Sequence, residues 1–270
     1  VSCDVWRSFA QYNIPATLLS SRGKPCAAHM GAGLSATVTN RIAQYRALFN
    51  SDCSLEISRW LLTKKMQGQI DVLDKLSGPK LNTSFFQKQI NECIKKLELS
   101  VCGNQLMGYE GVAASAYFKC FVQKLPLKWN FKGRNRRPSL DPVNALLSLS
   151  YTIAMGQVSR SIVSKGLDAS LGFLHTPQPN RENLVLDIIE PLRPQIDWFV
   201  LQLLDNMIFV ENFNTNPQDG CRLTKEGRNL YYSAWALWQE ISENNIEVKS
   251  RQIIKDFFDF FPTSLIPHRA

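Results

Sequence analysis

Hydrophobic residues recur at intervals of three and four along most of the chain, the spacing of one face of an α-helix. Glycine and proline interrupt this pattern, as at Gly78-Pro79 and from Pro217 to Gly220. The pattern therefore predicts a mainly α-helical chain. The predicted helices lie at about 34–49, 52–76, 83–100, 104–124, 141–165, 182–210, 224–244 and 248–259.

The first thirty residues have a different pattern. Residues 14–20 are typical of a strand, residues 21–25 supply turn chemistry, and Cys26 to His29 favour a second strand. Two strands alone are not stable. We therefore expect residues 1–30 to be a partial β domain with a linker, and residues 31–270 to be a helical domain.

Two prolines mark local breaks in the predicted helices. Asp141 followed by Pro142 is typical of a helix start, with the aspartate as the cap, so a structural role is expected for Asp141. Pro191 follows Glu190 directly, and proline disfavours regular helix around it. We expect a kink near Glu190 that changes the direction of its carboxylate.

The composition describes an ordinary globular protein with a basic surplus. The 270 residues include 31 Lys and Arg against 23 Asp and Glu, a net charge of +8, and 44% are hydrophobic. The surplus favours acidic partners, nucleic acid first among them. Apolar stretches are too short for a membrane span. Seven scattered cysteines without a C-x-x-C pair argue against a disulfide framework or a zinc ribbon, and favour a reducing cytosol.

Six of the positive charges gather between residues 124 and 137, where no acid is present. Such a segment can neutralise phosphates, and the interleaved Trp129 and Phe131 can stack on exposed bases. A solvated loop that only aids solubility is the alternative. The basic residues are Lys124, Lys128, Lys132, Arg134, Arg136 and Arg137.

Four side chains are candidates for a metal site. Glu110 lies among small residues that would let a ligand approach closely, and His175 ends an apolar stretch. Asp187 and Glu190 share one helix face among Leu and Ile, where buried acids must be paired, hydrogen-bonded or bound to metal. Arg193 is an available partner for Glu190, so a plain ion pair stays open.

The end of the chain carries four phenylalanines, at positions 257, 258, 260 and 261. They fall at the end of a predicted helix. They can dock on the protein's own core or on a partner, and the sequence leaves both open.

Several blocks of sequence agree in order and spacing with one known family. They are Gly108-Tyr-Glu-Gly-Val-Ala-Ala114, Trp129-Asn-Phe-Lys-Gly-Arg-Asn-Arg-Arg-Pro138, Asp141-Pro-Val-Asn-Ala-Leu-Leu147 with Tyr151, Gly172-Phe-Leu-His175, Leu186-Asp-Ile-Ile-Glu-Pro-Leu-Arg-Pro194 and Leu223-Thr-Lys-Glu-Gly-Arg228. Together they resemble the CRISPR spacer-acquisition integrases (Cas-one). The clear resemblance covers about residues 103–230.

The resemblance implies a helical catalytic domain preceded by an amino-terminal β domain, of which only a short remnant is expected here. It implies a metal-dependent DNA endonuclease and integrase that inserts spacer DNA into the CRISPR array. It places metal ligands at Glu110, His175 and Glu190, with Asp187 as a nearby contributor, and carboxylates with one histidine suit Mg²⁺ or Mn²⁺. We expect Lys132, Arg134, Arg136 and Arg137 to bind DNA.

The same resemblance implies partners: protospacer and repeat DNA, a second copy of the chain, and the family's small companion adaptation protein (Cas-two). Some members are fused to a reverse transcriptase, and we expect a missing amino-terminal part or such a junction before Val1. Two alternatives remain: a DNA-binding scaffold with a degenerate site, and a related transposon-borne integrase.

Overall fold

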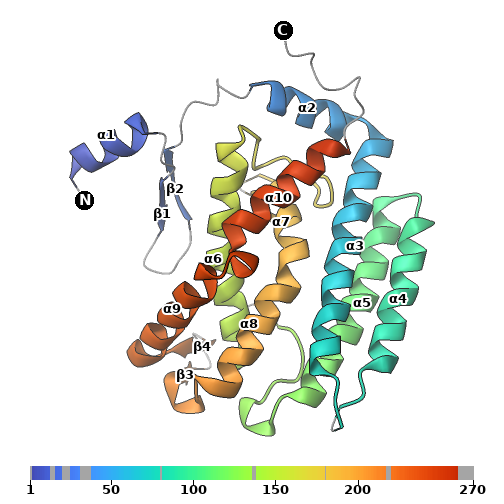
Figure 1. Cartoon of the computed structure of the whole chain (residues 1–270), viewed down its shortest axis with the longest axis vertical. Helices are drawn as coiled ribbons and strands as arrows, with labels where there is room; N and C mark the ends of the chain where they lie inside the picture. Colours follow the sequence, from blue (N-terminus) through green and yellow to red (C-terminus); the bar gives the residue numbers. More distant parts are fainter. Residues whose placement is uncertain are drawn as a thin grey trace. The chain divides into compact units, whose positions relative to one another are not determined.

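The computed structural model describes residues 2–12, 16–19, 25–30, 38–79, 81–135, 138–179, 181–216 and 220–260. The chain forms two compact units. The first unit combines Val1–Ser58, Thr152–Glu190 and Ile246–Ala270, and the second combines Arg59–Tyr151 and Pro191–Asn245. The fold is mainly helical, as the sequence predicts (Figure 1).

The elements follow one another along the chain as in Figure 1. They are α1 (Cys3–Gln11), β1 (Ala16–Leu19), β2 (Pro25–Met30), α2 (Val38–Phe49), α3 (Ser51–Leu76), α4 (Ser84–Glu98), α5 (Gly103–Lys124), η1 (Leu127–Trp129), α6 (Pro142–Ser164), α7 (Asn183–Ile189), η2 (Glu190–Leu192), α8 (Arg193–Asn206), η3 (Val210–Asn212), β3 (Phe213–Asn216), β4 (Gly220–Leu223), α9 (Lys225–Glu240), η4 (Ser242–Asn244) and α10 (Ile246–Asp259).

Each region predicted to be helical contains a helix. Regular helix is interrupted near Glu190, as Pro191 predicts, because the 3₁₀ turn η2 lies between α7 and α8. The predicted strand pair is also confirmed, since β1 and β2 are antiparallel with Ala16 opposite Met30. Helix α1 and the hairpin of β3 and β4 were not predicted.

Helices α4 and α5 pack along each other in the second unit (Figure 1). Arg59 ties α3 to the end of α4, because its guanidinium donates to the carbonyl oxygens of Leu97 and Ser100 at 2.9 and 2.8 Å. Trp129 is 1% exposed and meets the Phe213 ring edge-on, and Phe131 is also buried. The expectation that these two aromatics stack on bases is therefore wrong: both belong to the core.

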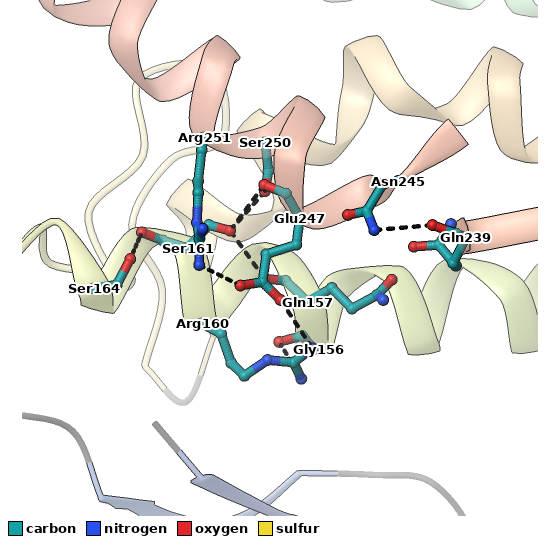
Figure 2. Close-up of polar contacts among 10 residues, drawn as sticks. All are labelled: Gly156, Gln157, Arg160, Ser161, Ser164, Gln239, Asn245, Glu247, Ser250 and Arg251. Atoms are coloured by element: carbon teal, nitrogen blue, oxygen red, sulfur yellow. Dashed lines mark hydrogen bonds and ion pairs between the residues drawn. The ribbon is translucent and has the colours of Figure 1, made fainter. Parts of the chain in front are cut away.

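Helix α10 packs against α7 in the first unit. A polar seam joins α10 to α6, as Figure 2 shows: the buried hydroxyls of Ser250 and Ser161 lie 2.7 Å apart. The Phe257 ring is fully buried and meets Phe173 edge-on. The sequence left open whether the phenylalanine-rich end packs on the protein's own core or on a partner. Phe257 packs on the core of its own unit. Phe261 lies outside the described residues.

The described cysteines carry free thiols. Burial raises the pKa of the Cys53, Cys93 and Cys221 thiols, and that of Cys120 to about 11. Each of these thiols is therefore held in its protonated, unreactive form near neutral pH. Among the helices of the described ranges, none is both long enough and apolar enough to cross a bilayer.

Candidate metal and nucleic-acid site

Glu110 faces a cavity of about 510 Å³ in the second unit. The small residues Gly111 and Ala114, one and four positions further along α5, line the same cavity and leave it open: a Cβ on Gly111 would meet nothing within 4 Å. Two acidic side chains share the wall with five cationic ones. The acids are Glu110 and Asp197, and the cations are Lys65, Lys119, Lys132, Arg134 and Arg193.

Lys65 on α3 holds the carboxylate of Glu110. Its Nζ lies 2.5 Å from Oε1, the lysine side chain is 9% exposed and the glutamate 20%. Because the lysine side chain is largely buried, solvent screens this pair less than it screens a fully exposed ion pair. A positive charge thus sits against Glu110 at the wall of the cavity.

The basic segment is anchored where it meets α6. Asn144 is fully buried; its Oδ1 accepts from Arg134 Nη1 at 2.5 Å and its Nδ2 donates to Asp141 Oδ2 at 2.7 Å. Asp141 in turn caps α6, since its Oδ1 accepts from the backbone N–H of Asn144 at 2.9 Å. The capping role expected for Asp141 is confirmed, and the same network aims Arg134 at the cavity.

Tyr151 and Asp197 form a buried pair in this wall that the sequence did not reveal. The tyrosine hydroxyl donates to Asp197 Oδ1, and burial raises the pKa of Asp197 to about 6 against the opposing effects of this bond and of Arg134 and Arg193. The guanidinium groups of Arg193 and Arg134 lie 4.5 and 5.4 Å from the centre of the Tyr151 ring. The pair thus supports both arginines by cation–π contact.

His175 and Asp187 come together in the first unit. His175 Nδ1 lies 2.7 Å from Asp187 Oδ1, and the aspartate is fully buried in α7. Backbone N–H groups of Phe173, Leu174 and His175 donate to the same carboxylate at 2.5, 3.0 and 3.1 Å. Burial raises the pKa of Asp187, and these bonds oppose the rise.

Gly172 allows the loop of residues 172–175 to pack closely against the Asp187 carboxylate. A Cβ at this position would stand 2.6 Å from Asp187 Oδ2 and 2.8 Å from the backbone of Asn183. No side chain larger than hydrogen fits there without moving α7 or the loop. The glycine therefore allows the loop to close around Asp187.

The four predicted ligands are distributed over both units. Glu190 is 6% exposed in η2, and His175 and Asp187 touch, all within the first unit, whereas Glu110 belongs to the second. Within the described parts of the chain, no three His, Cys, Asp or Glu side chains form a group able to hold a metal ion. Both oxygens of Asp187 are engaged by donors, which favours support of His175 over direct ligation.

The structure describes two of the four predicted DNA-binding residues. Lys132 and Arg134 line the same cavity as Glu110, which agrees with the expectation that the basic segment lies near this acid. Arg136 and Arg137 lie outside the described residues. Lys65 and Arg193 also line the cavity, although no sequence pattern assigns them to it.

Comparison with known proteins identifies the family. The family model described as CRISPR associated protein Cas1 matches residues 1–236. A CRISPR-associated endonuclease Cas1 of Chlorobaculum tepidum is 30% identical over 251 residues, which span 88% of this chain and 71% of that protein. This chain belongs to the Cas1 family. The resemblance seen in the sequence blocks is thereby confirmed for the family of CRISPR-associated Cas1 endonucleases.

Solved structures show the same fold at low sequence identity. A casposase bound to its integration product superimposes with a TM-score of 0.78 at 20% identity, over all of this Cas1 chain and 80% of the casposase. A Cas6-RT-Cas1–Cas2 complex superimposes with a TM-score of 0.79 at 20% identity, over 96% of this chain and 30% of the other. The helical Cas1 architecture is therefore shared by these proteins.

Proposed function

We propose that this Cas1 chain is a CRISPR adaptation integrase and DNA endonuclease that inserts spacer DNA by metal-dependent transesterification. In this reaction a DNA 3′-hydroxyl attacks a phosphodiester and a new 3′-hydroxyl leaves. Glu110, His175 and Glu190 are the proposed metal ligands. The proposal rests on family membership and on the state of His175.

The observation that carries the proposal is the bond between His175 and Asp187. A buried carboxylate that accepts a hydrogen bond from Nδ1–H fixes the imidazole ring and its tautomer. The lone pair is then on Nε2, and metal-binding histidines are commonly held in this way by a carboxylate behind the ring. A histidine needed only for packing would not require such an arrangement.

The chemistry of the proposed ligands suits a divalent cation. Two carboxylates with one imidazole suit Mg²⁺ or Mn²⁺, and the Lys65 ammonium already supplies a positive charge to Glu110 where an ion would neutralise it. When bound, the ion would activate the attacking hydroxyl and stabilise the charge that develops on the phosphate. The further contributions come from the chain's own residues.

Cationic side chains of the Glu110 cavity hold the DNA backbone in this proposal. Lys132 and Arg134 bind phosphate oxygens, and Asn144 limits the freedom of Arg134 before DNA arrives. Arg136 and Arg137 of the same segment are proposed to extend this contact along the DNA. Asp187 keeps the His175 ring oriented, so its contribution is made through the histidine.

The partners proposed for this chain follow the family. They are protospacer and repeat DNA, a second copy of the chain, and the small companion protein Cas2. The similarity to a complex named for Cas6, a reverse transcriptase, Cas1 and Cas2 supports a reverse transcriptase as a fused or associated partner.

The test compares strand transfer of a 3′-hydroxyl oligonucleotide by Glu110→Gln, His175→Ala and Glu190→Gln variants with the wild type in Mg²⁺ or Mn²⁺. We expect each to lose at least a thousandfold in rate with an unchanged circular dichroism spectrum, because each lacks a metal ligand. Glu226→Gln, an exposed acid at the start of α9, is the matched control. Wild-type transfer by the His175→Ala variant would exclude this metal site. DNA binding without any metal-dependent activity of the wild type would identify the scaffold instead.

A further inference from the structure

Helix α10 lies outside the part of the chain that the Cas1 family model matches. The match ends at residue 236, and α10 runs from Ile246 to Asp259. The helix is nevertheless integrated in the first unit, where it packs against α7, the helix that carries Asp187. Helix α10 also contacts the loop of residues 172–175, which donates to Asp187 and is called the His175 loop below.

An aromatic contact joins α10 to that loop. Phe257 is fully buried, and its ring centre lies 4.9 Å from that of Phe173 with the planes 76° apart, an edge-to-face geometry. The backbone N–H of Phe173 is one of the three that donate to Asp187 Oδ2 or Oδ1. Phe173 thus contacts α10 through its side chain and Asp187 through its main chain.

A polar seam fixes where α10 lies on α6. Ser250 Oγ is 2.7 Å from Ser161 Oγ and 2.9 Å from the backbone oxygen of Glu247, and both hydroxyls are fully buried (Figure 2). The Glu247 carboxylate lies between Arg160 of α6, at 3.5 Å, and Arg251 of α10. Buried hydroxyls must find partners, so the seam favours one position of α10 along α6.

These contacts form a continuous path from α6 to His175. The seam fixes α10, α10 fixes the Phe173 ring, and Phe173, Leu174 and His175 donate their N–H groups to Asp187. We propose that α10 is a positioning element for His175, with Phe257 as its positioning residue. That the positioned imidazole binds metal rests on the proposed function; that α10 orders the loop does not.

The experiment measures amide hydrogen exchange of the metal-free protein and its Mn²⁺ affinity by electron paramagnetic resonance. In Phe257→Ala, we expect the amides of residues 173–175 to exchange at least tenfold faster while the amides of α4 and α5 keep their wild-type rates. Mn²⁺ affinity should fall about tenfold. Phe257→Leu, which refills most of the space, should restore most of both. Val248→Ala, on an exposed position of α10, is the control.

Unchanged exchange at residues 173–175 in Phe257→Ala overturns the positioning role. If Phe257→Ala speeds exchange throughout the chain, Phe257→Leu decides: a residual acceleration confined to residues 173–175 supports the role, and an acceleration that extends equally to the amides of α4 and α5 overturns it. Faster local exchange in Phe257→Ala, together with undiminished Mn²⁺ binding by His175→Ala, would keep the positioning role and reject the metal role. The two proposals therefore fail in distinguishable ways.

Discussion

Two regions of this Cas1 chain hold an acid by opposite means. Glu110 stands at the wall of an open cavity and is held by the long side chain of Lys65, with further cations around it. Asp187 is fully buried and is held by three backbone N–H groups and the His175 ring. The first arrangement leaves the carboxylate able to exchange its partner, and the second does not.

This difference suits the two regions to different tasks in the proposed reaction. Flexible charged side chains adapt to an arriving ion or phosphate, since Lys and Arg can change rotamer at small cost. Main-chain donors cannot move without moving the loop, so they suit a group whose orientation has to be fixed in advance. We therefore expect the two regions to respond differently to substitution.

The largest contrast should come from matched glycine substitutions. Gly172→Ala forces a Cβ against Asp187 and Asn183, and we expect it to lower the free energy of unfolding by roughly 2–4 kcal/mol. Gly111→Ala, in open space on α5, should be neutral or stabilising by about 0.5–1 kcal/mol, because alanine favours helix. Urea unfolding followed by circular dichroism measures both. Equal effects would refute the contrast.

A smaller effect concerns the buried acid beside the Glu110 cavity. The pKa of Asp197 is raised from 3.8 to about 6, so the folded chain binds its proton more tightly than the unfolded chain. The free energy of unfolding should therefore fall as pH rises from about 4 to about 6, by roughly 2–3 kcal/mol from this group.

The check is urea unfolding of the wild type and Asp197→Asn at several pH values in this window. The variant cannot titrate at this position and should lose that part of the pH dependence. Parallel pH curves for the two proteins would show that Asp197 titrates normally.

Removal of the Lys65 charge should strengthen metal binding at Glu110. The lysine competes with an ion for the same carboxylate and repels it, so we expect Lys65→Met to tighten Mn²⁺ binding about five- to tenfold, or about 1 kcal/mol. Lys119 lines the same cavity from an exposed position, so the control Lys119→Met should change the Mn²⁺ affinity less than twofold. Weaker Mn²⁺ binding by Lys65→Met would contradict the competition.

The smallest expected effect is on the salt dependence of DNA binding. Each cation that neutralises a phosphate contributes about one unit to the slope of log affinity against log salt concentration. Arg134→Ala should lower that slope by about 1, whereas Arg222→Ala on the hairpin strand β4, an exposed arginine outside the cavity lining, should not change it. Fluorescence anisotropy with a labelled duplex at several salt concentrations measures the slope.

Most helices could be predicted from the spacing of hydrophobic residues and from the glycines and prolines that interrupt it. Long amphipathic stretches predict α3 and α5 almost to the residue, and Pro191 predicts the break in regular helix between α7 and α8. The hairpin of β3 and β4 was missed because each strand has four residues and only Phe213 of β3 is buried. Four-residue strands, one mostly exposed and one mostly buried, carry no alternating pattern that would reveal them.

The site was accessible in part. The sequence blocks identify Glu110 and His175, but not the way each is held. Lys65 lies 45 positions from Glu110, so the contact depends on how α3 and α5 pack. Phe131 resembled a base-stacking residue because basic neighbours surround it, although its side chain is buried. The bonds to Asp187 could not be predicted either, since three of them come from the main chain.

Those main-chain bonds also determine which substitutions the loop tolerates. Leu174 donates to Asp187 only through its N–H, which every residue except proline possesses. A saturation library at position 174 should therefore return most amino acids among functional clones and deplete proline. At the Glu110 cavity the contact is made by Nζ, an atom that only lysine carries, so every substitution at position 65 removes that contact. Substitutions are thus tolerated better at positions where the backbone, and not the side chain, makes the contact.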